Sequence, residues 1–377
     1  MNGSNLIFKK QQGTALITVV LIAAVVIVMV IESVKTVKYQ KQLSSNLINR
    51  DQAFSYLLGM EELAKIYLKK AFENTEEDTV HLGQLWAQED ITFPIDGGGM
   101  TATIRDMQSC FNLNALLKPS SQGSGERGGG ERGGEEEGSP RSVNEGLTAS
   151  SNSRSSNEDD SGRPSELTGV KVLEVLIDKV KPDSSVIGKD LTAAFKDWMD
   201  EDIEPTGAEG AEDDYYQGLE IPYRTANSQI AHESELLTIK GFNREIYFAL
   251  RPLICVLPDD SINEVNVNTV SAESATLLYA IIDANNSSAT TNINEGDVSK
   301  AISERPEEGY ESISDFVQAM GLEDTQSFRS ENLTVTSAYF EMRAKAEIGK
   351  TRVEMKTLFK KDEDKNFTVV SRYFGRE

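Results

Sequence analysis

Apolar residues are distributed most unevenly at the start of the chain. Residues 1–13 are polar and include Lys9 and Lys10, whereas residues 14–31 contain no charged side chain. A helix of this length extends about 27 Å, close to the thickness of a bilayer's hydrocarbon core. No small-x-small pattern follows the segment, as an ordinary cleavable signal would require. The segment therefore predicts a membrane-spanning helix that stays attached to the chain.

The helical pattern continues beyond the apolar segment. No proline occurs between Glu32 and Asn74, and apolar residues recur mostly at three- and four-residue steps. We therefore expect one long helix, whose second half is an amphipathic stem.

A second pattern, strict alternation of apolar and polar residues, marks candidate strands. It occurs at residues 91–94, 99–106, 333–346, 351–360 and 366–373. Alternation with a period of two is typical of strands with one buried face. These segments predict one antiparallel sheet, interrupted by residues 107–332.

The interrupting region is predicted to be mostly helical. Apolar residues have helical spacing at residues 170–180, 191–199, 234–250, 271–283, 297–302 and 312–320. Residues 119–164 differ, since they are mainly Gly, Ser, Glu and Arg, and we expect a disordered surface loop there.

Two of the helical segments, 233–250 and 265–282, each place a polar cap before a short amphipathic helix. Both resemble helix-hairpin-helix or SAM-like units. The second has no lysine or arginine, so a structural use is favoured over DNA binding.

Composition narrows the functional classes. The formal charge of -23 argues against nucleic acid as a partner, because phosphate backbones are also negative. The only cysteines, Cys110 and Cys255, are too few for a cysteine-ligated zinc site. His81 and His232 lie in unrelated contexts, and no nucleophile elbow, P-loop or paired-histidine zinc motif occurs. We therefore predict that the chain is not an enzyme.

Residues 200–220 are unusually acidic, and no basic residue lies between Lys196 and Arg224. Pro205, Gly207 and Gly210 could bend this segment back on itself. Calcium accepts oxygen ligands in such irregular loops, although the spacing is not that of an EF-hand. The candidate ligands are Asp200, Asp202, Glu209, Glu212, Asp213 and Asp214, with Asn227 and Gln217 as further oxygen donors and Tyr215 and Tyr216 as anchors to a core. A solvated acidic loop without metal is the alternative.

The N-terminal features together resemble a type IV prepilin. The basic leader ends in Gly13, cleavage is expected between Gly13 and Thr14, and the new N-terminus is expected to be methylated. Most members carry a glutamate at the fifth mature position, which here is Thr18. Together with the chain length, this uncharged position resembles the minor pseudopilin called general secretion pathway protein K of type II secretion systems. Asn-Leu-Asn at 112–114 and Asn-Val-Asn at 266–268 look like elements of that family, where asparagines can cap helices.

The resemblance implies an α+β, pilin-like fold: a long N-terminal helix on a small antiparallel sheet, with a large, mostly α-helical inserted domain. The expected divisions are leader 1–13, transmembrane helix 14–31, stem and first strands 32–106, inserted domain 107–332 and C-terminal strands 333–377. It also favours calcium, because this family binds calcium through an Asp-x-Asp and a Gly-Ala-Glu-Asp segment similar to those here.

The same resemblance implies a structural role: capping the pseudopilus tip and priming its assembly for protein export across the outer membrane. The implied partners are the other minor pseudopilins, the major pseudopilin, the prepilin peptidase and the inner membrane, and also secreted substrates and the secretin channel. A membrane-tethered periplasmic binding module unrelated to pili is the alternative.

The expected topology is a single pass through the inner membrane with the soluble part in the periplasm. Lys9 and Lys10 precede the apolar segment, which keeps them in the cytoplasm by the positive-inside tendency, although lysines at 35, 38 and 41 weaken this signal. In an oxidising periplasm, an even cysteine count predicts a bridge between Cys110 and Cys255, with two buried thiols as the alternative.

Overall fold

The computed structural model describes residues 14–73, 78–87, 91–117, 168–181, 187–286, 293–322 and 328–375. The chain divides into two compact units. Unit 1 contains residues 1–74, 85–105 and 341–377, and unit 2 contains residues 75–84 and 106–340. Gly13 and the expected loop at 119–164 lie outside the described residues.

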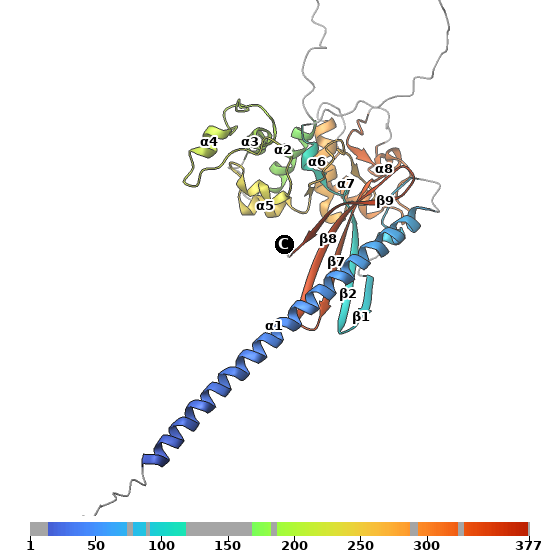
Figure 1. Cartoon of the computed structure of the whole chain (residues 1–377). Helices are drawn as coiled ribbons and strands as arrows, with labels where there is room; N and C mark the ends of the chain where they lie inside the picture. The colour runs from blue at the N-terminus through green and yellow to red at the C-terminus, as the bar shows by residue number, and fades with distance from the viewer. Residues whose placement is uncertain are drawn as a thin grey trace, which may run out of the picture. The chain divides into compact units, whose positions relative to one another are not determined.

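Unit 1 is built on one long helix, α1 (Thr14–Glu73), as the continuous pattern predicted (Figure 1). Within the described part of the chain, this is the one helix long and apolar enough to cross a bilayer, and its most apolar stretch is exposed throughout. Further along, α1 buries one stripe of small and large apolar residues. The stripe contains Ala53, Leu57, Met60, Ala64, Leu68 and Phe72. Steps of three and four place them on one helical face, which packs against the sheet.

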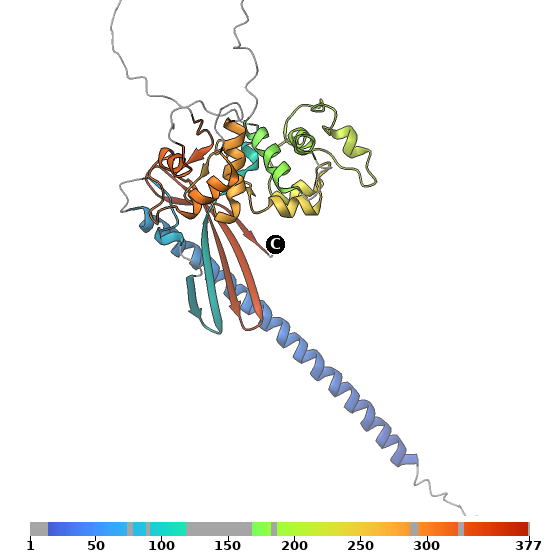
Figure 2. The ribbon, with the colours of Figure 1, turned by 180° about the vertical axis from the view of Figure 1, so that it is seen from behind.

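The sheet of unit 1 has five strands in the order β1-β2-β7-β8-β9. Their bounds are Ile91–Ile95, Gly98–Asp106, Tyr339–Ile348, Thr351–Lys361 and Phe367–Phe374. Figure 2 shows β2 beside β7, although more than 200 residues separate them in sequence. The predicted single sheet interrupted by an insertion is therefore confirmed.

An ion pair between a buried carboxylate and an exposed arginine joins α1 to this sheet. Glu61 on α1 is 1% exposed, and its carboxylate accepts bonds from Arg372 Nε at 2.5 Å and Nη2 at 2.8 Å. Thr357 Oγ1 donates a further bond at 3.2 Å. The bonds from Arg372 hold the pKa of Glu61 below its usual value despite burial. The charge on the helix is thus satisfied by two neighbouring strands.

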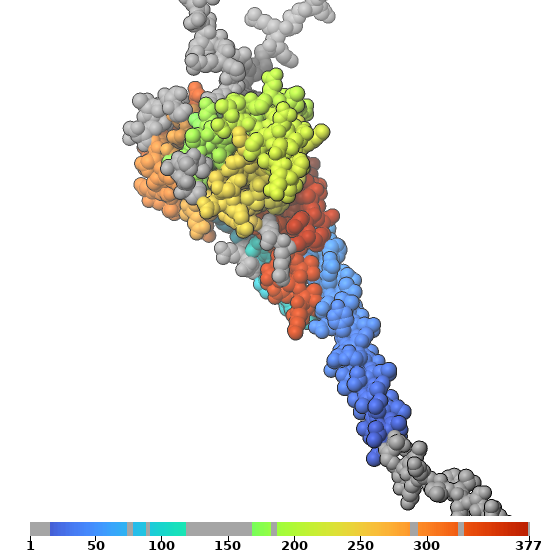
Figure 3. All heavy atoms as spheres, turned by 90° about the vertical axis from the view of Figure 1, so that its left-hand side faces the viewer, coloured from blue at the N-terminus to red at the C-terminus, as the bar shows by residue number. Residues whose placement is uncertain are grey.

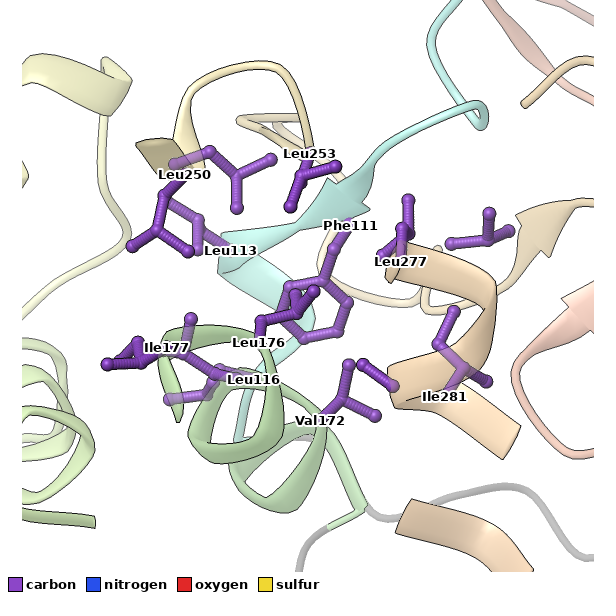
Figure 4. Close-up of a cluster of buried hydrophobic side chains, with 14 of the residues drawn as sticks. Phe111, Leu113, Leu116, Val172, Leu176, Ile177, Leu250, Leu253, Leu277 and Ile281 are labelled. Carbon is purple, nitrogen blue, oxygen red and sulfur yellow. The ribbon is translucent and has the colours of Figure 1, made fainter. Parts of the chain in front are cut away.

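Unit 2 is mostly helical. Its α-helices are α2 (Thr168–Val180), α3 (Gly188–Met199), α4 (Asp213–Gln217), α5 (Arg244–Leu250), α6 (Ala275–Asn286), α7 (Glu295–Ser303) and α8 (Ile313–Ala319). Short strands join distant segments in parallel, β3 (Phe111–Asn112) with β4 (Ile254–Cys255), and β5 (Val265–Asn266) with β6 (Leu333–Thr334). Figure 4 shows leucines and isoleucines of α2, α5 and α6 converging around Phe111.

Three predicted elements differ from the structure. Residues 234–250 form a 3-10 turn, Glu233–Thr238, and then α5, because Gly241 takes a φ of +84° and Asn243 caps a new helix. Residues 271–283 begin with a separate 3-10 turn, Ala272–Ser274. The predicted strand 333–346 is divided into β6 and β7, since Thr334 Oγ1 accepts a bond from the backbone N–H of Thr336 and turns the chain.

The asparagine motifs tie loops together more than they cap helices. Asn112 does cap the short 3-10 helix Leu113–Ala115, as predicted. Asn114, however, exchanges bonds with Ile230 and donates to the backbone of Leu257. Asn268 similarly pairs with both backbone groups of Tyr310. Each amide side chain imitates a strand partner for a segment distant in sequence.

A buried carboxylate, Asp106, connects the two ends of the insertion within unit 2. Its Oδ2 accepts bonds from Thr269 Oγ1 and Ser337 Oγ, each at 2.6 Å, and from Asn266 Nδ2 at 3.2 Å. Its Oδ1 accepts the backbone N–H of Gln108 at 2.8 Å. Burial raises the pKa of Asp106, and the four donors oppose that effect.

We expect Asp106→Ala to destabilise unit 2 strongly, because it leaves several buried donors without an acceptor. The loss should be about 3 kcal/mol or more, which corresponds to a fall of roughly 6–12 °C in Tm. Thermal unfolding of the detergent-solubilised chain measures it, and Glu273→Ala, an exposed acid of the same unit, is the control. A Tm within 2–3 °C of the parent, roughly the shift of a 1 kcal/mol change, would contradict a stabilising role for this network.

Candidate metal centre and family membership

The acidic segment begins where α3 ends. Asp197, in the last turn of α3, is fully buried. Its carboxylate accepts the backbone N–H of Thr206 at 3.0 Å and that of Ala211 at 2.7 Å. A Cβ at Gly210 would collide with Asp197 Oδ2, so the return of the chain requires glycine there. Asp197 thus folds the segment back toward the helix.

This return brings three carboxylates together. Single oxygens of Asp197, Asp200 and Glu212 all lie within 4.8 Å of one another. Among the described residues, Asp200 Oδ1 and both carboxylate oxygens of Glu212 are buried without a hydrogen-bond donor. Lys196 Nζ lies 3.7 Å from Asp200 Oδ2. Buried carboxylates without donors are costly, so this arrangement suits a bound cation.

The electrostatics of the cluster point the same way. Burial, followed by the charges of Asp197, Asp200, Asp202 and Asp213, raises the pKa of Glu212 to about 7. Burial and the charge of Asp202 also raise the pKa of Asp200. Both groups therefore resist carrying a negative charge side by side unless a positive charge is present.

The other candidate ligands have different surroundings. Asp213 accepts bonds from the N–H and Oγ1 of Thr225, both at 3.0 Å, and the backbone bond is the main cause of its lowered pKa. Gln217 Nε2 donates to Asp213 Oδ2 at 3.3 Å. Glu209 forms an ion pair with Lys240 at 3.5 Å, and the carboxylate of exposed Asp202 accepts the backbone N–H of Glu204 at 2.9 Å. Asp214 is exposed on α4. Of the six predicted acids, Asp200 and Glu212 belong to the cluster.

Asp197 was missed because it lies within a predicted helix. The signal was present, since residues 194, 195, 198 and 199 are apolar and an acid stands among them. An acid on the buried side of an amphipathic helix needs a partner, which in this chain is the returning loop.

Asn227 remains a candidate oxygen donor. It takes a φ of +43°, and its N–H donates to the carbonyl of Trp198 at 3.0 Å. Its Oδ1 is buried without a donor among the described residues. Tyr216 is fully buried and lies 5.3 Å from the ring of Trp198, whereas Tyr215 is 42% exposed. Of the two predicted anchors, Tyr216 therefore fixes the loop to the core.

The predicted cysteine pair is also brought together. Cys110 and Cys255 form a disulfide with their Cα atoms 5.7 Å apart. It lies beside the β3–β4 pair, so the bridge and the parallel ladder hold the same two segments of unit 2.

Comparison with known proteins assigns the chain to a family. Two models of one family, described as type II secretion system (T2SS), protein K, match residues 109–259 and 265–336, together more than half of the chain. The chain belongs to the type II secretion system protein K family. It is 29% identical to type II secretion system protein K of Aeromonas hydrophila, over 97% of this chain and 98% of that protein. The Pseudomonas aeruginosa protein K is 27% identical, over 97% and 93%.

A solved structure supports the fold. It is entitled the crystal structure of the GspK–GspI–GspJ complex from enterotoxigenic Escherichia coli, and the match has a TM-score of 0.65 at 24% identity, covering 87% of this chain and 97% of that one. The predicted α+β class, with a long helix on an antiparallel sheet and a mostly helical insertion, is confirmed.

Family membership also establishes the general function. The chain is a minor pseudopilin of the type II secretion system, a structural component and not an enzyme. The alternative of a binding module unrelated to pili is therefore wrong.

The cluster predicts a pH dependence for the metal-free protein. The folded-state pKa of Glu212, about 7, lies above its ordinary value of 4.5, so the folded chain binds the proton more tightly than the unfolded chain. Stability should therefore fall as the pH rises from about 5 to 7, and Glu212→Gln should flatten this slope. Thermal unfolding in chelator across this range measures it, with Asp214→Asn as control. The same change in Tm over this window for the parent and the Gln variant would contradict the assignment.

Proposed function

We propose that this chain caps the tip of the pseudopilus and primes its assembly in the inner membrane. The observation that carries the proposal is the apolar N-terminal helix with an uncharged Thr18, because a subunit without a neighbour above it does not need a carboxylate there. The matched solved structure is entitled a complex of GspK with GspI and GspJ. This title supports the proposal that the other minor pseudopilins are partners of this chain. The major pseudopilin is the proposed neighbour below the tip.

The proposed topology is a single pass through the inner membrane, with the soluble part in the periplasm. Lys9 and Lys10 before α1 support a cytoplasmic leader, and the disulfide in unit 2 suits an oxidising compartment. The proposed divisions are leader 1–13, membrane helix 14–31, stem and first strands 32–106, inserted domain 107–332 and final strands 333–377. We further propose that segments 233–250 and 265–282 are SAM-like units used structurally; the turn at Gly241 between two short helices supports the first.

The proposed metal is calcium, held by Asp197, Asp200 and Glu212, with Asn227 as an additional oxygen donor. The donor set consists of hard oxygens, which calcium prefers. The carboxylate oxygens of Glu212 without donors support a cation at this position. Asp202 and Asp213 add their negative charge from nearby, whereas Glu209 is paired with Lys240 and Asp214 is exposed. Calcium, when bound, would neutralise the buried carboxylates, and the residues themselves do no chemistry.

Processing tests the leader. We expect prepilin peptidase to cut after Gly13, so that mass spectrometry of the mature protein finds Thr14 at the N-terminus, carrying a methyl group. Gly13→Leu should keep the leader. An intact Met1 in the parent chain, or a start near Val30, would contradict the pilin-like route.

The tip position is tested by restoring a charge. Thr18→Glu should leave secretion unchanged or impair it, because an unpaired carboxylate in lipid costs about 2.5–3.5 kcal/mol. Thr18→Gln is the control, because glutamine has nearly the size of glutamate but no charge. Enhanced export by the Glu variant, measured as secreted protein in the medium, would show that this position needs a carboxylate and that the chain is not the cap.

Calcium binding is tested by calorimetric titration of the chelator-stripped chain in detergent. We expect roughly micromolar binding and a rise in Tm with added calcium by mass action. Glu212→Gln should weaken binding about tenfold or more, and the exposed Asp214→Asn should bind as the parent does. Equal binding by parent and Glu212→Gln, or only millimolar binding by the parent, would favour the alternative of a solvated acidic loop without metal.

A further inference from the structure

Residues 200–223 have a second feature that the carboxylate cluster does not use. Ile203 and Ile221 are 77% and 79% exposed. Among the large hydrophobic residues of the described chain these are the highest values, above those in the apolar part of α1. A single exposed isoleucine needs no explanation, but several exposed apolar side chains on one segment indicate an interaction surface.

Three further exposed side chains belong to this segment or lie beside a residue hydrogen-bonded to it. Tyr215 and Tyr223 are 42% and 36% exposed, and their rings lie 5.1 Å and 5.2 Å from the ring of buried Tyr216. Tyr223 Oη donates to the carbonyl of Thr238 at 2.7 Å, next to Leu237, which is 42% exposed. Buried Tyr216 therefore holds the exposed rings in fixed positions, which lowers the entropy cost of binding.

The polar residues of this surface are nearly all acidic. Exposed acids of the segment are Glu201, Asp202, Glu204, Glu209, Asp214 and Glu220. The nearby basic groups are already paired, Lys240 with Glu209 at 3.5 Å and Arg224 with Asp213 at 3.7 Å. A negative, apolar surface repels nucleic acid and anionic lipid, and it is complementary to basic protein segments.

We propose that Ile203, Tyr215, Ile221, Tyr223 and Leu237 form a docking surface for a basic, apolar segment of a partner protein. Figure 3 shows the yellow-green segment that carries most of them at the surface of unit 2, facing the viewer. Apolar contacts supply the affinity, and the surrounding carboxylates orient the lysines or arginines of the partner. None of the five side chains belongs to the carboxylate cluster, so the proposal does not depend on the identity of the metal.

Photo-cross-linking in secreting cells tests the surface with the full chain. p-Benzoylphenylalanine replaces Ile203 or Ile221, and, as a matched control, Phe248 on α5, which is 52% exposed outside the acidic segment. We expect positions 203 and 221 to capture one shared protein segment with net positive charge and apolar residues, and position 248 not to capture it. Cross-links to an acidic segment, cross-links to lipid, or none from either position would overturn the proposal.

A binding measurement with model peptides separates apolar docking from general attraction of opposite charges. The probes are a lysine–leucine amphipathic peptide and its glutamate–leucine counterpart of equal length. We expect the full chain in detergent to prefer the first, and Ile203→Ser with Ile221→Ser to weaken it about tenfold or more, whereas Phe248→Ser changes little. An unchanged affinity in the double variant, or equal losses in both variants, would overturn the apolar surface.

Discussion

The hydrogen bonds around Asp106 are the constraint on which the rest of the insertion depends. The chain leaves the sheet after β2 and returns to it at β7, and Asp106 and Ser337 stand beside those two points. Met107 also donates its N–H to the carbonyl of Tyr339 at 2.9 Å, so the two ends of the insertion are held by backbone as well as side chain. Because both ends are fixed together, a helical region can be inserted into a pilin-like sheet without breaking the pairing of its strands.

Most of the fold could be predicted from the periodic spacing of apolar residues. The long helix, the five-stranded sheet and its interruption follow from apolar spacing that local geometry makes unambiguous. The predicted element boundaries are wrong where the backbone or side chain of a single residue interrupts the apolar spacing. Gly241, with its positive φ, divides a predicted helix, and Thr334 turns a predicted strand through its hydroxyl. Pairings such as β5 with β6 involve two residues each, too few for any periodic signal.

The candidate metal centre shows what the sequence alone does not determine. The acidic composition of residues 200–220 was sufficient to locate it, but not to select its members. Selection depends on which carboxylates the folded loop buries, and this is decided by backbone bonds from Thr206 and Ala211 to Asp197. Asp213, from the same segment, instead accepts the backbone N–H of Thr225. Charge density locates the acidic segment, and burial determines which of its carboxylates form the cluster.

The disulfide between Cys110 and Cys255 encloses 144 intervening residues, from a sequence separation of 145. Within this covalent ring lie α2 to α5 and the whole acidic segment. A single cut of the backbone anywhere inside the ring leaves both pieces joined, so the fragments cannot diffuse apart. Unit 2 thus keeps its two halves at high effective concentration after proteolytic nicking, until the bridge is reduced.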